Sequence, residues 1–163
     1  MLLIYGGLRR AECAAICLKD IVQKEEHHVL IVQSGKGRKR RDIPLRPDVF
    51  RSITSYLESV GRLDDNPDSK LFMGFYKGCA PSHRPITDRQ IPNIVESYAA
   101  KAHVTATPHD LRASAITYWL DTGANIVQVQ RLAGHADPKV TERYYTRHQD
   151  LDNSPVYRVD LNN

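Results

Sequence analysis

The sequence is poor in cysteine and has no long apolar run, and both absences exclude classes of protein. No hydrophobic stretch approaches the roughly 20 residues of a membrane-spanning helix, so we expect neither a membrane segment nor a membrane partner. The three cysteines are an odd number, which does not suit a disulfide framework, and we expect free thiols. The chain begins without a basic leader or a small-residue cleavage site, so the expected location is cytoplasmic.

Sequence patterns that bind metal ions or nucleotides are also missing. The sequence holds no cluster of carboxylates and no Cys/His spacing suited to Mg²⁺ or Zn²⁺. It also lacks the glycine-rich phosphate loop of ATPases. We therefore expect no metal ion and no cofactor, and any chemistry has to come from the side chains themselves.

The composition is that of one globular domain with a modest positive charge. The 163 residues are 41% hydrophobic and 26% charged, and the formal net charge is +4. This balance permits a nucleic-acid partner without requiring one. Five basic residues lie close together in one segment: Lys36, Arg38, Lys39, Arg40 and Arg41. Taken alone, such a run is equally typical of a solvated hairpin tip.

The hydrophobic pattern predicts a small sheet near the N-terminus. Residues 29–32 form a β-branched run typical of a strand, and residues 42–45 resume an apolar pattern after the basic segment. The Gly-Lys-Gly turn at 35–37 joins these strands into a hairpin, because glycine can adopt positive φ angles. Residues 18–22 supply a third antiparallel strand, with a turn at 24–26.

Helical periodicity dominates the rest of the chain. Apolar residues recur at helical spacing in four segments and again after a helix-starting Asp-Pro pair. These segments are 49–60, 87–102, 108–123, 126–132 and the residues from Asp137-Pro138 onward. Residues 62–85 are predicted to be loops around a short apolar piece. The fold class is therefore α+β and mainly α, with a small three-stranded antiparallel sheet near the N-terminus.

Several polar residues stand where packing alone does not require them. They are Arg9 and Glu12 at the start of a helix, His109 and Arg112 on one helical face, His135 in a turn, and Tyr144 and Tyr145 in a late helix. Each has an ordinary explanation. Arg9 and Glu12 suit a helical ion pair, and a tyrosine on an amphipathic helix is usually part of the core or its rim.

Together, these residue types are what metal-free cleavage of a phosphodiester needs. An arginine fork can hold the non-bridging oxygens in a bidentate manner and offset the charge that builds up in the transition state. A tyrosine hydroxyl can attack phosphorus and form a covalent ester once a base takes its proton. A lysine or histidine can protonate the leaving oxygen.

The order and spacing of these residues resemble the tyrosine recombinase (phage integrase) family. The motifs are Gly-Leu-Arg-x-x-Glu at 7–12, Gly-Lys-Gly at 35–37, His-x-Leu-Arg at 109–112, Leu-Ala-Gly-His at 132–135 and Thr-x-Arg-Tyr at 141–144. The step of 26 residues from His109 to His135, and nine more to Tyr144, makes the combination highly specific. The resemblance implies a catalytic domain over residues 1–147 and a C-terminal tail over 148–163.

The resemblance also implies a role for each matching residue that faces the phosphate. Arg9 and Arg112 correspond to the two arginines that clamp the scissile phosphate. Lys36 corresponds to the hairpin lysine that protonates the 5′-oxygen leaving group. His135 matches the position that hydrogen-bonds the phosphate.

The remaining roles concern the nucleophile. Tyr144 matches the tyrosine that forms a 3′-phosphotyrosine link, and His109 matches the histidine that takes up and returns its proton. The nine-residue step from His135 and the preceding Arg143 favour Tyr144 over Tyr145. We expect the six catalytic candidates to converge on one basic surface cavity.

Partners follow from the same resemblance. Double-stranded DNA is the implied substrate, and further basic residues of the hairpin would contact its phosphates with little base selectivity. These are Arg38, Lys39, Arg40 and Arg41. Family members act as tetramers of protomers on DNA. For this chain we expect a monomer or weak dimer without DNA, and association with the nucleoid when it is bound.

The predicted function is site-specific DNA recombination by strand cleavage and rejoining. Arg9 lies almost at the start of the sequence, so we expect an N-terminally truncated catalytic domain without the core-binding domain of the family. Two alternatives stay open. One is strand cleavage of the type IB topoisomerase kind, which uses the same tyrosine chemistry. The other is a catalytically idle DNA-binding remnant of a mobile element.

Overall fold

The computed structural model describes residues 1–33, 40–76 and 81–145, without the side chain of Tyr145. In chain order the elements are α1 (Leu2–Gly6), α2 (Arg10–Ala15), the 3₁₀ helix η1 (Leu18–Asp20), β1 (Ile21–Lys24), β2 (His27–Val32), β3 (Arg41–Pro44), α3 (Pro47–Ser59), β4 (Met73–Phe75), β5 (Pro81–Pro85), α4 (Ile91–Lys101), α5 (Pro108–Asp121), α6 (Ile126–Ala133) and α7 (Pro138–Tyr145). Within these ranges, no helix is both long and apolar enough to cross a membrane.

The predicted three-stranded antiparallel sheet is confirmed, with the strand order β1-β2-β3. β1 pairs with β2 around a turn at Glu25–Glu26, and β2 pairs with β3 so that Val32 lies opposite Arg41. Successive side chains of a strand point to opposite faces. In β3, Arg41 and Ile43 are buried and Asp42 between them is exposed. Arg41 therefore shares the inner face of its strand with a core isoleucine.

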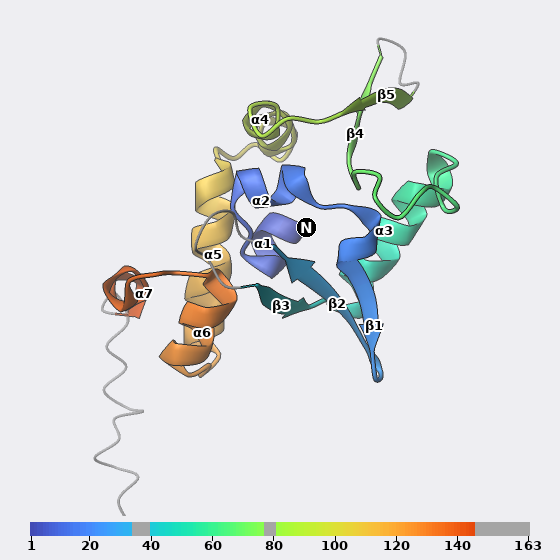
Figure 1. Ribbon diagram of the computed structural model, residues 1–163. Helices are drawn as coiled ribbons and strands as arrows, with labels where there is room; N and C mark the ends of the chain where they lie inside the picture. Colours follow the sequence, from blue (N-terminus) through green and yellow to red (C-terminus); the bar gives the residue numbers. More distant parts are fainter. Residues whose placement is uncertain (34–39, 77–80, 146–163) are drawn as a thin grey trace, which may run out of the picture.

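The core consists of two apolar clusters that α5 connects. The larger one joins the N-terminal helices to the sheet, and Leu8, Leu30 and Leu71 are fully buried in it. The smaller one lies between α5 and α6, where Ile116 and Val129 are fully buried. α5 packs along α1 and also against α6 and α7 (Figure 1). The N-terminal and C-terminal thirds of the chain are thereby brought side by side.

The helix boundaries in the last third follow from capping residues that the sequence carries. Thr107 caps α5 through its side chain, and Pro108 takes the first helical position, where its missing N–H is tolerated. Asn125 caps α6, and Gly134 ends it in the left-handed region with a φ of 64°. Asp137 precedes α7 and accepts a backbone N–H of its first turn. The structure agrees with the predicted helices here.

Three features of the fold differ from the sequence prediction. The strand predicted over residues 18–22 begins later, because Leu18–Asp20 form η1 and β1 covers Ile21–Lys24. Residues 62–85, predicted as loops, include the strands β4 and β5, which pair in antiparallel fashion. These strands are short and their register is irregular, so no period-two pattern marks them in the sequence. α4 begins at Ile91 rather than directly after Thr87. The side chain of Gln90 accepts the Thr87 N–H at 2.8 Å and holds the preceding residues in a turn.

Gly7 is a point of very close approach between the N-terminal helices and α5. Its φ is 58°, and a Cβ atom there would lie 2.6 Å from Cη2 of Trp119. Gly61 has a similar φ of 66°, but a Cβ there would meet no described atom within 4 Å. Gly61→Ala is expected to lower the free energy of unfolding by about 1–2 kcal/mol, the cost of a left-handed alanine. For Gly7→Ala we expect about 1–3 kcal/mol more, because the core is also overpacked.

Urea unfolding of the two variants measures this difference. Because the two glycines have similar φ angles, the backbone cost is the same in both variants. The additional loss of unfolding free energy in Gly7→Ala therefore measures the contact with Trp119 alone. Equal losses for Gly7→Ala and Gly61→Ala would mean that the indole does not press on this turn.

Candidate active site

The centre of the site is the C-terminal end of α6, where three arginines bind consecutive backbone carbonyls. Each carbonyl accepts one guanidinium N–H: Leu132 from Arg41 at 2.8 Å, Ala133 from Arg112 at 2.6 Å and Gly134 from Arg9 at 2.7 Å. The last carbonyls of a helix have no partner within it and carry the negative end of the helix dipole. The arginines satisfy these acceptors, and they bring the start of α2, β3 and α5 together at one point.

Glu12 ties two of these arginines to each other. Its Oε1 accepts from Nη1 of Arg9 at 2.8 Å and from Nη1 of Arg41 at 3.0 Å, and its Oε2 accepts from Nη2 of Arg41 at 2.7 Å. Oε2 also accepts the backbone N–H of Arg9 at 2.8 Å, which caps α2. The ion pair between Arg9 and Glu12 that the sequence suggests is therefore present, and it is part of a larger cluster.

Two opposing effects act on the pKa of Glu12. Burial raises it, whereas hydrogen bonds and charge from Arg41 and Arg9 lower it and outweigh burial. The pKa of Glu12 falls from an ordinary 4.5 to about 2. Glu12 is thus a carboxylate at neutral pH. The four side chains of this group carry three guanidinium cations and one carboxylate, and the resulting positive charge favours the binding of an anion.

The lowered pKa makes a prediction for stability. Because the pKa of Glu12 is lower in the folded protein than in the unfolded chain, the carboxylate stabilises the fold above about pH 4.5, and this stabilisation is lost as the pH falls toward 2. We expect Glu12→Gln to lower the free energy of unfolding near neutral pH. The difference from the unsubstituted chain should shrink by about 3 kcal/mol as the pH falls from about 5 to about 2.

Urea unfolding at a series of pH values checks this prediction. Glu58→Gln, an exposed position on α3, corrects for the loss of one carboxyl group in general. A difference between Glu12→Gln and the unsubstituted chain that stays constant across the acid range would contradict the pairing of Glu12 with the two arginines.

Arg112 lies at the innermost position of the cluster. Its side chain is buried, and besides the bond to Ala133 it donates a hydrogen bond from Nη1 to the carbonyl of Gly7. Burial lowers the pKa of Arg112 to about 10; the charge of Arg9 acts in the same direction and that of Glu12 opposes it. Arg112 is therefore still a cation at neutral pH. Arg9 and Arg112 lie 103 positions apart in the sequence and reach neighbouring carbonyls.

His135 follows the turn at Gly134 and connects the arginines to α7. Its Nδ1 shares a hydrogen bond of 2.8 Å with Oγ1 of Thr141, which is fully buried. Its ring stacks beside that of Tyr144, with centroids 6.3 Å apart and an angle of 13° between the planes. Burial, and then the charges of Arg112, Arg9 and Arg41, lower the pKa of His135 to about 4. The imidazole is therefore neutral at pH 7. In the tautomer in which Nδ1 accepts from the Thr141 hydroxyl, Nε2–H is the group that can donate to an anion.

The structure brings together four of the six predicted catalytic residues. These are Arg9, Arg112, His135 and Tyr144. His109 lies one turn before Arg112 on α5, where its side chain is exposed and has no hydrogen bond or ion pair to another described residue. Lys36 lies outside the described residues. Tyr145 belongs to α7, but the structure does not describe its side chain.

The basic segment divides into different environments. Arg38 and Lys39 lie outside the described residues. Arg40 is exposed, with Nε 3.6 Å from a carboxylate oxygen of Asp42. Arg41, predicted to be a phosphate contact, instead has a side chain that is only 8% exposed and turned inward onto Glu12. The sequence prediction is wrong here because neighbouring residues of the basic run lie in different environments. Alternation along β3 places Arg41 on the face of Ile43.

Thr141 is a site residue that the sequence reasoning did not single out. Its only signal was its place in the Thr-x-Arg-Tyr motif, three residues before Tyr144. One helical turn separates the two positions, so both lie on the face of α7 that meets His135.

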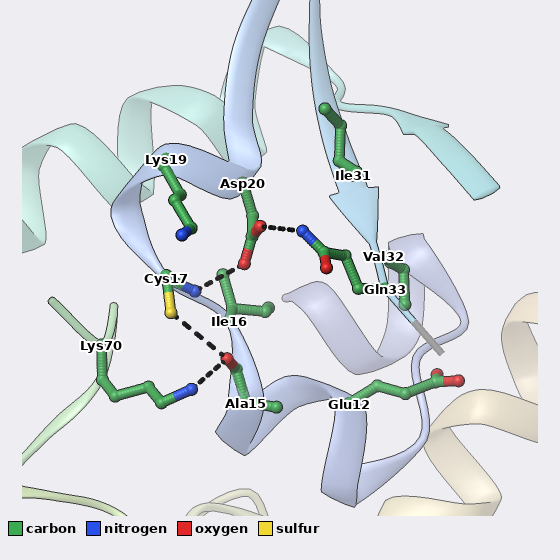
Figure 2. Close-up of a pocket in the computed structure, with 10 residues that line it drawn as sticks. All are labelled: Glu12, Ala15, Ile16, Cys17, Lys19, Asp20, Ile31, Val32, Gln33 and Lys70. Carbon is green, nitrogen blue, oxygen red and sulfur yellow. Dashed lines mark hydrogen bonds between the residues drawn. The ribbon is translucent and has the colours of Figure 1, made fainter. Parts of the chain in front are cut away.

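Glu12 also lines a cavity of about 260 Å³ that lies between α2, η1 and β2 (Figure 2). Within it, the carboxylate of Asp20 accepts hydrogen bonds from the Cys17 backbone and the Gln33 side chain, and Lys70 donates to a backbone carbonyl of α2. The four assembled candidates do not line this cavity, so it is not the basic cavity that the sequence predicts.

Comparison with known proteins gives the family. The model of the phage integrase family matches residues 1–151. The chain is 34% identical over 145 residues to the tyrosine recombinase XerA of Pyrococcus furiosus, covering 88% of this chain and 48% of that protein. It is 31% identical over 150 residues to the tyrosine recombinase XerC of Myxococcus xanthus, covering 88% and 47%. The chain belongs to the phage integrase family, and it spans about half the length of these curated relatives.

Solved structures agree with this placement. The crystal structure of XerA recombinase matches with a TM-score of 0.73 and 27% identity, covering 96% of this chain and 54% of that one. The XerH site-specific recombinase bound to its difH substrate matches with a TM-score of 0.71 and 21% identity, covering 93% and 42%. The second likeness is one of fold alone. The fold is that of tyrosine recombinase catalytic domains.

Proposed function

We propose that this chain is the catalytic domain of a site-specific recombinase that cleaves and rejoins DNA through a covalent 3′-phosphotyrosine. The observation that carries the proposal is the meeting of Arg9 and Arg112 at adjacent carbonyls, beside a histidine that stacks on Tyr144. Cleavage of a phosphodiester by side chains alone requires a nucleophile and positive charge beside it, and a tyrosine next to an electropositive cluster supplies both. The relatives' names as tyrosine recombinases support the same activity.

In the proposed reaction, the arginines and His135 bind the scissile phosphate. Each guanidinium has five N–H groups, so Arg9 and Arg112 retain donors for the non-bridging oxygens beyond those given to the carbonyls. A neutral His135 whose Nδ1 accepts from the Thr141 hydroxyl presents Nε2–H as a third donor. These groups are held before the substrate arrives, so they stabilise the developing charge without reorganising.

The chemical step is a transfer of the phosphoryl group to tyrosine and back. Oη of Tyr144 attacks phosphorus and gives its proton to His109, the P–O5′ bond breaks, and Lys36 protonates the departing 5′-oxygen. The phosphotyrosine ester retains the energy of the broken bond. A 5′-hydroxyl from another strand can therefore reseal the DNA without ATP.

DNA binding in this proposal rests on basic residues outside the clamp. Arg40 is exposed, and Arg38 and Lys39 precede it in the sequence. Contacts of this kind hold the backbone with little base selectivity and weaken as salt rises. The proposal further includes association with other protomers on DNA, a monomer or weak dimer without DNA, and action in the cytoplasm on the nucleoid.

Trapping of a covalent adduct tests the proposed function. Two forms of the protein are compared: the chain alone, and the chain with a core-binding domain fused at its N-terminus. Each is incubated at high protein concentration and low salt with a labelled pool of nicked DNA duplexes of randomised sequence. The nick lets the short 5′-hydroxyl strand diffuse away after cleavage, so the DNA cannot be resealed and the adduct accumulates. We expect a labelled protein band that survives denaturation.

Other outcomes favour the alternatives. No adduct in either form would favour an idle DNA-binding remnant. An adduct accompanied by relaxation of supercoiled plasmid, without joining of two marked sites, would favour an enzyme of the type IB topoisomerase kind.

A further inference from the structure

Arg41 is a buried arginine that the proposed reaction does not use, and all of its described side-chain hydrogen bonds go to residues of the site. Nε donates to the carbonyl of Leu132, and the two Nη atoms donate to the two oxygens of Glu12. The side chains of Arg41 and Glu12 are 8% and 9% exposed. A guanidinium held in this way is not placed to bind DNA phosphates.

Glu12 connects Arg41 to Arg9, the first clamp arginine. Oε1 of Glu12 accepts from both Arg41 and Arg9, so the carboxylate bridges the two guanidinium groups. Arg9 in turn donates to the carbonyl of Gly134. With Arg41 removed, the carboxylate of Glu12 would keep only its bonds to the backbone N–H and Nη1 of Arg9 among the described hydrogen bonds, and nothing would hold it from the side of β3.

Arg41 also shapes the turn that carries His135. A Cβ atom on Gly134 would lie 2.8 Å from Nη1 of Arg41 and 3.1 Å from its Cζ. The backbone of the turn therefore lies directly against the guanidinium plane. Gly134 has a φ of 64°, so both the conformation and the space favour glycine immediately before His135.

We propose that Arg41 is a positioning residue for strand cleavage, which holds Arg9 through Glu12 and holds the His135 turn through Leu132 and Gly134. This inference rests on the proposed function, because it concerns the same site. Lysine cannot replace Arg41 in this role. Its single ammonium group lacks the planar fork that reaches both carboxylate oxygens and the carbonyl at once.

The test compares Arg41→Lys with Arg62→Lys in the same chain. Arg62 is a matched control, because it is also a buried arginine and donates to a carboxylate, that of Asp65, and to the carbonyls of Lys70 and Leu71 outside the cluster. Three quantities are measured for each variant: stability to urea, DNA affinity, and the single-turnover rate of adduct formation on the nicked pool.

We expect Arg41→Lys to stay folded and to bind DNA with an affinity within about 3-fold of that of the unsubstituted chain. It should form the adduct about 100-fold more slowly, which is the effect that a misplacement of a catalytic group by about 1 Å produces. Arg62→Lys should retain the rate. A folded Arg41→Lys variant with an unchanged rate would overturn the proposal. An equal loss of rate in Arg62→Lys would show a general effect of disturbing a buried arginine, and would overturn it too.

A second variant tests the proposal if Arg41→Lys does not fold. Gly134→Ala places a methyl group against the same guanidinium from the turn, and should slow adduct formation equally while DNA affinity is retained. A normal rate of adduct formation would overturn the proposal.

A measurement without DNA applies if the unsubstituted chain forms no adduct. The proposed function then fails, and the role of Arg41 is tested by NMR of the free protein. The ring resonances of His135 should move in Arg41→Lys and stay in place in Arg62→Lys, and unmoved resonances in Arg41→Lys would contradict the positioning role.

Discussion

Tyr144→Phe is expected to abolish the covalent protein–DNA adduct while leaving DNA affinity nearly unchanged. The variant lacks only the hydroxyl that attacks phosphorus, so the rate of adduct formation should fall by at least about 1,000-fold. The ring that packs beside His135 and the small cluster of α5 and α6 stays in place. Binding is dominated by phosphate charge, to which a neutral hydroxyl adds little. Denaturing gels measure the adduct, and a filter-binding titration measures affinity.

Tyr145→Phe is the matched control for this prediction. Neighbouring residues on a helix point about 100° apart, so only one of the two tyrosines can face the arginines. The ring of Tyr144 lies beside His135, which is the reason for preferring it. Tyr145→Phe should therefore retain the adduct. An adduct that survives Tyr144→Phe and disappears with Tyr145→Phe would overturn the assignment.

Arg112→Ala is expected to slow adduct formation by about 100- to 1,000-fold, the usual effect of removing one preorganised donor from a developing charge. The substitution also leaves the carbonyls of Gly7 and Ala133 without their guanidinium donors, so the variant should lose stability as well. Rates are therefore compared at a temperature where urea titration shows the variant to be folded.

Two further variants separate the effect of Arg112→Ala on the rate of cleavage from its effect on stability. Arg112→Lys keeps the charge but not the planar fork, and should still be slow. Arg62→Ala removes a buried arginine outside the cluster, and should lower stability without slowing the folded protein. A folded Arg112→Lys variant with the original rate would mean that charge alone, rather than the bidentate geometry, is what the phosphate requires.

Local signals explain why much of the fold could be predicted from the sequence. The ends of α5, α6 and α7 are set by capping residues such as Thr107, Asn125 and Asp137, which act within one turn of the chain. The antiparallel sheet was predictable because its strands alternate or are rich in β-branched residues. β4 and β5 were missed, since they are short and their pairing is irregular.

The sequence predicts which residues belong to the candidate site, but not how their side chains are bonded. Motif order predicts that Arg9, Arg112, His135 and Tyr144 belong together, and the structure places them close to one another. Nothing in the sequence says that arginines bind the carbonyls at the end of α6. That arrangement depends on α5 packing between the two ends of the chain. The error at Arg41 has a different origin, because strand alternation from Ile43 would have placed it inward.

Mapping the DNA-linked residue tests the central claim most directly. The trapped adduct is digested with nuclease and protease, and the peptide that carries the residual nucleotide is sequenced by mass spectrometry. We predict a nucleotide linked through a 3′-phosphate to the Oη of Tyr144. A nucleotide on Tyr145, on a serine or on any other side chain would contradict the account.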